Sequence, residues 1–94
     1  VEHAKDPEHA LLARLRLAGI LLDEKAYDEG LKLLAVGDAG AFAGAFADRR
    51  GDLLLAQGKR DEARAAYKTA LERLERGAAL RPLVQMKLDA LGGA

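Results

Sequence analysis

Apolar and polar residues alternate along this chain with a helical period, and the pattern predicts five helices. Apolar side chains recur at three- and four-residue spacing, and the breaks between these stretches hold glycine, aspartate or proline. The predicted helices cover residues 8–22, 28–36, 41–57, 61–75 and 83–91. Pro7 suits the first turn of the first helix behind an Asp6 N-cap, and Pro82 suits the opening of the last. The expected fold class is therefore all-α.

Glycines mark the predicted helix ends. The segment Gly37 to Gly40 separates the second helix from the third, because glycine lowers helix propensity and accepts positive φ. Gly58, Gly77 and Gly92 are expected to end the third, fourth and fifth helices. Val84, Leu88 and Leu91 should form a buried stripe on the fifth helix, and we also place Met86 in the core.

Residues 18–30 and 51–63 carry the same pattern at an offset of 33 residues. Each copy has a small residue, several aliphatic residues, a polar break, then Asp-Glu and another small residue. This period is typical of helical hairpin repeats, which must stack because one hairpin cannot bury its own apolar face. We predict a single domain over residues 1–94, built as a short right-handed solenoid. Repeats should cover about residues 8–37 and 41–76, with a capping helix at about 81–91.

The second copy has the small-residue spacing of a tetratricopeptide repeat. Small residues allow two helices to approach closely, a glycine makes the turn, and an aromatic ring fills the space between hairpins. The first copy is more degenerate, with Lys25 at the position of Gly58. The residues expected to pack the repeats are Ala18, Gly30, Gly51, Gly58, Ala63, Tyr67 and Ala70.

The first helix is apolar on almost every side from Ala10 to Leu22, apart from Arg14 and Arg16. A helix that is apolar all round is expected to be buried all round. We therefore predict an upstream helix pair in a longer protein, in keeping with a chain that begins with Val1 rather than methionine. Without that pair, the free face favours a homodimer through the first helix.

Composition makes several functions improbable. Lys plus Arg and Asp plus Glu number 15 each, so no net field attracts nucleic acid or an anionic membrane. Cysteine is absent, which excludes disulfides and thiol chemistry without fixing the compartment. No apolar run approaches the roughly 18–20 residues of a membrane-spanning helix, so we expect no membrane contact by this part of the protein.

Candidate catalytic and ligand-binding groups are sparse. His3 and His9 have no acidic or thiol partner at ligand spacing, and the acidic pairs recur at helix ends, where capping explains them. Thr69 is the single threonine and serine is absent, which leaves little scope for a hydroxyl nucleophile. The glycines between 37 and 44 lack the lysine of a phosphate-binding loop. We predict no enzymatic activity, no cofactor and no metal site.

A protein-binding groove is the remaining candidate site. In tetratricopeptide arrays the first helix of each hairpin lines the concave side. The groove predicted here is apolar at one end and charged at the other, which suits an amphipathic helix or an extended hydrophobic segment at modest affinity. Its residues are Leu12, Leu15, Gly19, Leu22, Asp48, Arg49, Asp52 and Leu55.

Four segments resemble a narrower family. They are Leu11-Leu-x-x-Leu-x-Leu17, Ala47-Asp-x-x-Gly-Asp-x-Leu-Leu-x-x-Gly58, Ala63-Arg-x-Ala-Tyr67 and Leu83-Val-Gln-Met-Lys-Leu-Asp-Ala-Leu91. Together they are similar to the carboxyl-terminal part of the YfgM-like family, tetratricopeptide proteins regarded as ancillary subunits of the bacterial Sec translocon. The resemblance implies an upstream membrane anchor and repeats on the periplasmic side of the inner membrane. It also implies translocon subunits and periplasmic chaperones as partners.

Two other hypotheses remain open. The chain could be a different tetratricopeptide adaptor, for example in outer-membrane assembly, and upstream sequence would discriminate: one apolar anchor favours the translocon role, whereas a cleavable signal or lipidation motif favours the adaptor. A small enzyme or metal protein is the third hypothesis. It predicts retained metal or turnover by the isolated domain.

Overall fold

The computed structural model describes residues 7–92, and the secondary structure of this part of the chain consists of helices joined by short turns and linkers, without strands. The all-α prediction is confirmed. The expected Asp6 N-cap and His3 lie outside the described residues. The elements are α1 (Pro7–Asp23), α2 (Tyr27–Leu34), a short 3-10 helix η2 (Gly40–Phe42), α3 (Ala43–Ala56), α4 (Arg60–Arg73) and α5 (Leu80–Ala90).

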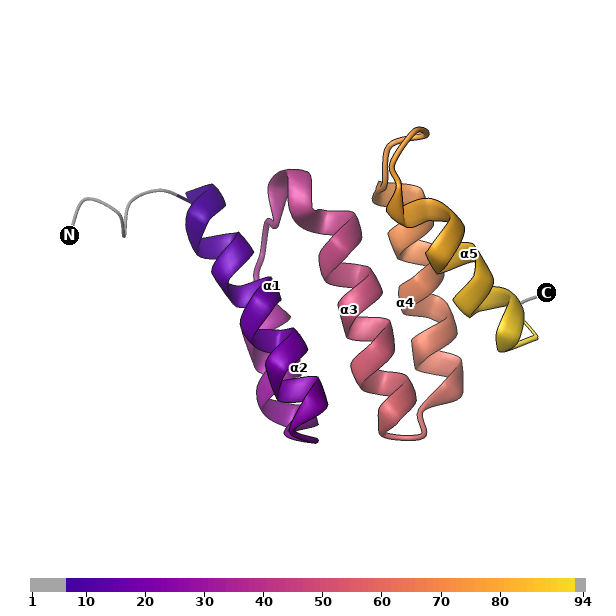
Figure 1. Cartoon of the computed structure of the whole chain (residues 1–94), viewed down its shortest axis with the longest axis horizontal. Helices are drawn as coiled ribbons and strands as arrows, with labels where there is room; N and C mark the ends of the chain where they lie inside the picture. Colours follow the sequence, from indigo (N-terminus) through magenta and orange to yellow (C-terminus); the bar gives the residue numbers. More distant parts are fainter. Residues whose placement is uncertain (1–6, 93–94) are drawn as a thin grey trace.

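The helices form two stacked antiparallel hairpins and a final single helix (Figure 1). The first hairpin is α1 with α2, the second is α3 with α4, and α5 packs against the side of α4 that faces away from the first hairpin. This is the arrangement that the 33-residue offset predicts, because each hairpin covers the apolar face of its neighbour.

Two apolar clusters hold the stack together. The first joins the first hairpin to α3, and the second joins α3, α4 and α5. Buried members of the first are Ala18, Leu34, Ala39, Phe46 and Leu53. Buried members of the second are Ala47, Leu54, Ala63, Ala66, Tyr67, Ala70, Val84, Leu88 and Leu91. Since α3 contributes to both clusters, it is the central element of the fold.

The repeat extends to the backbone of the turns. Lys25 has a φ of 64° and Gly58, 33 positions later, has a φ of 81°, so both hairpins turn through a left-handed residue. Gly92 has a φ of 73° just after α5, in agreement with the predicted stop. The prediction that Gly77 ends the fourth helix is wrong, because α4 already ends at Arg73 and the next residue, Leu74, is extended.

The last helix begins earlier than the sequence suggests. It starts at Leu80, and Pro82 occupies its third position, where a missing amide hydrogen removes no intrahelical bond. The stripe of Val84 and Leu88 is buried as predicted. The core placement of Met86 is wrong: its side chain is 61% exposed, because a position two residues after Val84 lies on a different face of the helix.

The first helix is less buried than its composition predicts. Ala18 is its one buried residue among those described, whereas Leu17 and Ile20 are 45% and 52% exposed. The apolar outer face of α1 is thus open in this structure. No helix within residues 7–92 is both long enough and apolar enough to cross a membrane.

Candidate protein-binding surfaces

The predicted groove residues lie on the first helix of each hairpin, four on α1 and four on α3. Gly19 and Arg49 bring the two stripes together: a Cβ atom added at Gly19 would lie 3.2 Å from the Arg49 Cζ atom. The absence of a side chain at position 19 therefore leaves space for the Arg49 guanidinium between the helices. The Arg49 Nε atom is buried and has no hydrogen-bond partner within the described chain.

The leucines of this groove are only partly available to a partner. Leu12, Leu15, Leu22 and Leu55 are all half-buried. Leu15 and Leu22 pack on the first apolar cluster, and Leu55 packs on the second. Each of these three therefore contributes one side to the core and another to the surface, whereas Leu12 belongs to neither cluster.

The charged end of the groove is bound by α5. Asp48 is only 7% exposed, and the Lys87 ammonium donates hydrogen bonds to Asp48 Oδ1 at 3.0 Å and to Asp52 Oδ2 at 3.2 Å. The Tyr67 hydroxyl donates to Asp52 Oδ1 at 2.6 Å. Lys87 Nζ also lies 5.8 Å from the centre of the Tyr67 ring. These charges therefore stabilise contacts within the chain, and they offer a partner much less than the sequence suggests.

Burial shifts the acidity of two groups in this network. The pKa of Asp48 is raised, first by desolvation and then by the neighbouring Asp52 charge, while the hydrogen bond and charge of Lys87 oppose the shift. The pKa of Tyr67 is raised by desolvation and by its hydrogen bond to Asp52. Sequence reasoning missed Lys87, although its place beside the predicted stripe of α5 put it close to the preceding hairpin.

The predicted packing residues occupy the contacts between helices. Ala18, Ala63 and Ala70 are fully buried, and Tyr67 is 1% exposed. A Cβ atom at Gly30 would lie 3.0 Å from Leu53 Cδ2, and one at Gly51 would lie 2.5 Å from the Tyr67 ring. Both glycines therefore permit close helix approach, whereas Gly58 supplies the left-handed turn described above.

The open face of α1 has a counterpart inside the molecule. Adding 33 to Leu17 and Ile20 gives Arg50 and Leu53 of α3. Both counterparts face the first hairpin: Arg50 donates a hydrogen bond to the Leu34 carbonyl at 3.2 Å, and Leu53 fills the space beside Gly30. The exposed residues of α1 thus occupy the positions through which α3 docks on a hairpin.

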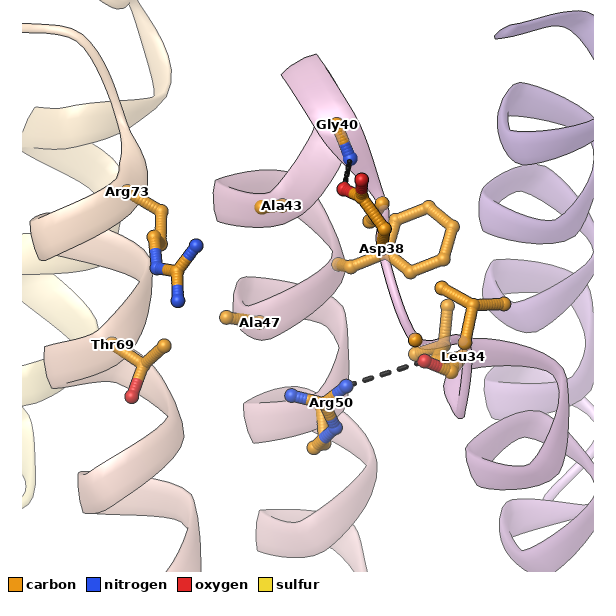
Figure 2. Close-up of a pocket in the computed structure, with 12 residues that line it drawn as sticks. Leu34, Asp38, Gly40, Ala43, Ala47, Arg50, Thr69 and Arg73 are labelled. Atoms are coloured by element: carbon orange, nitrogen blue, oxygen red, sulfur yellow. Dashed lines mark hydrogen bonds between the residues drawn. The ribbon is translucent and has the colours of Figure 1, made fainter. Parts of the chain in front are cut away.

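A pocket of about 190 Å³ lies where the end of α2, the following linker, α3 and α4 meet. Figure 2 shows Arg50 of α3, Thr69 and Arg73 of α4, and Asp38 of the linker around it. Sequence reasoning did not identify this site, because its residues come from segments far apart in the chain. Among residues 7–92 there is no cluster of three His, Cys, Asp or Glu side chains that could hold a metal ion.

Comparisons with known proteins agree with this architecture. The family model described as "Tetratricopeptide repeat-like domain" matches residues 1–93. The chain belongs to this family. This tetratricopeptide-like domain is also 37% identical, over 91 residues, to a protein of Neisseria gonorrhoeae (strain ATCC 700825 / FA 1090) named "Ancillary SecYEG translocon subunit". The match covers 97% of the domain and 44% of the relative, so the domain spans less than half of the relative's length. No solved structure matches it significantly.

Proposed function

We propose that this domain is a noncatalytic protein-interaction module of an ancillary Sec translocon subunit in the bacterial cell envelope. The observation that carries the proposal is the 37% identity with the ancillary translocon subunit, which extends over 97% of the domain. The fold supports the same role, because stacked hairpins present extended binding surfaces without requiring catalytic groups. The resemblance to the YfgM-like family favours a location on the periplasmic side of the inner membrane.

The proposed partners are translocon subunits and periplasmic chaperones, and the proposed contact surface is the groove of α1 and α3. Asp48 and Asp52 are bound by Lys87, so the accessible part is formed by the six other groove residues, all of them half-buried: Leu12, Leu15, Gly19, Leu22, Arg49 and Leu55. Half-exposed leucines beside one arginine suit an amphipathic helix or an extended apolar segment. Affinity should be modest, because each leucine exposes only part of its surface.

Photo-crosslinking in cells tests this proposal. A crosslinking amino acid replaces Leu12 in the full-length protein, because Leu12 lines the groove without belonging to either apolar cluster. The control probe replaces Lys68, an exposed residue of α4. We expect adducts with translocon subunits or periplasmic chaperones from position 12 and few from position 68. Equal labelling at both positions, or adducts with cytoplasmic proteins alone, would contradict the proposed role.

Self-association through α1 is a second proposal, favoured by the exposed Leu17 and Ile20. A second copy would cover this apolar face. Leu17 and Ile20 lie at the repeat positions that Arg50 and Leu53 use to contact the first hairpin. This contact does not compete with the groove, because Leu17 and Ile20 do not belong to the groove stripe of α1. Translocon binding and self-association are therefore separable by variants of different residues.

A further inference from the structure

The pocket between the two hairpins has an apolar floor and a basic rim. Leu34 is fully buried, and Phe46 and Ala47 are 2% and 1% exposed. Arg50, Thr69 and Arg73 supply polar groups above this floor (Figure 2). Arg50 is half-buried beside this floor, so its charge is less screened than in bulk water, whereas the Arg73 side chain is exposed at the rim.

The two guanidinium groups retain most of their hydrogen-bonding capacity. Arg50 donates from Nη2 to the Leu34 carbonyl, and Arg73 makes no ion pair or hydrogen bond with the described residues. Within residues 7–92, Asp38 is the one carboxylate that lines the pocket, and its Oδ1 accepts a hydrogen bond from the Gly40 amide. Two positive charges thus face a single negative one, which leaves the site with an excess positive charge.

We propose that this pocket binds an acidic side chain, glutamate or aspartate, presented by a protein partner. Guanidinium groups match the planar geometry of a carboxylate through paired hydrogen bonds, and the Thr69 hydroxyl adds another donor. The volume of about 190 Å³ corresponds to roughly six water molecules, which is enough for a carboxylate and its short methylene stem. Val36, Ala39 and Ala43 offer apolar contacts to such a stem.

This inference rests on the proposed interaction function and deepens it, because it gives the chemistry of one partner segment. The pocket is distinct from the groove: none of the eight predicted groove residues lines it. A partner could therefore use an apolar segment in the groove and an acidic residue at the pocket. The two contacts are testable separately.

The test is a peptide titration of the purified chain followed by nuclear magnetic resonance. The probe is a blocked Ala-Ala-Glu-Glu-Ala-Ala peptide, with its glutamine counterpart and inorganic phosphate as comparisons. We expect the glutamate peptide to shift the Arg50 and Arg73 side-chain signals and the glutamine peptide to leave them in place. Arg73→Gln should weaken binding at least about fivefold, because it removes a charge-assisted contact.

Two further variants distinguish specific binding of the peptide in the pocket from nonspecific electrostatic attraction to the protein surface. Arg60→Gln makes the same charge change at the opposite end of α4, outside the pocket, and should alter binding less than about twofold, as expected for a screened charge. Asp38→Asn keeps the acceptor for the Gly40 amide but removes the negative charge, so it should tighten peptide binding. A variant that merely disturbed the fold would not improve affinity.

Several outcomes overturn this inference. Equal weakening by Arg73→Gln and Arg60→Gln would indicate attraction to the overall surface. Shifts with phosphate but none with the glutamate peptide would assign the site to a phosphate group instead. Loss of translocon crosslinks in cells with intact peptide binding would reject the proposed function alone, whereas the reverse pattern would reject only the acidic-residue pocket.

Discussion

Gly51 lies directly against the ring of Tyr67, at the point where α3 and α4 approach each other. An added Cβ atom would meet the ring at 2.5 Å, and the Tyr67 side chain is buried and held by its hydrogen bond to Asp52. We expect Gly51→Ala to destabilise the fold by about 1–3 kcal/mol through overpacking. This exceeds the roughly 0.5–1 kcal/mol that alanine gains over glycine within a helix. Chemical denaturation followed by circular dichroism measures the difference.

Gly19→Ala is the matched control for that substitution. Its nearest neighbours are the terminal atoms of the Arg49 side chain, which is long enough to shift. We expect this variant to be as stable as the original chain or slightly more stable. A comparable loss in both variants would show that glycine itself, rather than the Tyr67 contact, is required in these helices.

Asp48 gives the fold a specific pH dependence. Burial raises its folded-state pKa above the ordinary value of 3.8, so the folded state binds a proton more readily than the unfolded state. The contribution of this group to stability therefore increases as pH falls from above the folded pKa toward the unfolded value. Asp48→Asn cannot titrate, yet it keeps an oxygen acceptor for Lys87.

Denaturation of both proteins at several pH values tests this. As pH falls from neutrality toward the ordinary aspartate pKa of 3.8, we expect the stability of the original chain, relative to Asp48→Asn, to rise. The comparison cancels the other titrating groups to the extent that they are independent of position 48. A relative stability that falls with decreasing pH would show that the Lys87 contact dominates over burial.

The roles of individual residues were predictable at positions where the tetratricopeptide repeat requires a particular type of side chain. The small residues at 18, 30, 51 and 63 follow from the need for close helix contact. Lys25 shows the limit of prediction from residue type. It has the same left-handed φ as Gly58 in the corresponding turn, but no glycine marks this turn in the sequence. The binding of Asp48 by Lys87 was not predictable, since it depends on how α5 is placed over α3.

Two arginines connect α4 and α5. Each arginine lies on one of these helices and donates hydrogen bonds to backbone carbonyls at the carboxyl-terminal end of the other helix. Arg81 donates to the carbonyls of Leu71 and Leu74 at 2.6 and 3.0 Å, and Arg64 donates to the Leu91 carbonyl at 2.8 Å. The last carbonyls of a helix have no intrahelical partner, and positive charge at this end is favourable. Each helix therefore caps the other, which explains why α4 ends without the glycine expected at position 77.

Arg81→Gln tests this reciprocal capping. We expect a loss of about 1–3 kcal/mol, because charge-assisted bonds to two otherwise unpaired carbonyls are removed. Hydrogen exchange should accelerate most strongly in α5, because this last helix packs mainly on α4. Arg76→Gln is the control, since Arg76 is exposed and makes no hydrogen bond with the described residues. Equal effects of the two variants would argue against capping.

At the scale of elements, the sequence predicted the number and order of the helices because apolar periodicity determines which face each helix buries. It placed the start of α5 three residues late, since proline was read as an opening residue and Leu80 was left out. The early start matters for packing, because Leu80 adds an apolar contact to the second cluster.

The whole molecule presents exposed apolar pairs at its two ends. Leu17 and Ile20 are exposed on α1, and Leu83 and Met86 are exposed on α5. Of these two pairs, only Leu17 and Ile20 lie at repeat positions that, in α3, contact the preceding hairpin. We therefore expect Leu17→Glu with Ile20→Glu to abolish self-association, because a charge would be buried in an apolar interface. Leu83→Glu with Met86→Glu should leave it unchanged.

Sedimentation over a wide range of concentrations measures this difference. The proposal of self-association fails if the original chain stays monomeric throughout the range, or if both double variants dissociate it equally. At this scale the stacked architecture was predictable from the 33-residue offset alone. The pocket between the hairpins was not, because Arg50 and Arg73 become neighbours of one cavity only after the hairpins have stacked.

The hydrogen bond from Tyr67 to Asp52 has an optical consequence. The chain has two tyrosines and no tryptophan, so Tyr27→Phe would leave Tyr67 as its one ultraviolet chromophore of this class. Burial and the Asp52 carboxylate both hold the phenol in its protonated form. In alkaline solution, tyrosinate absorbance should therefore appear together with the loss of helical signal rather than before it. The phenol that joins α3 to α4 would then report, without any added dye, whether the second hairpin is closed.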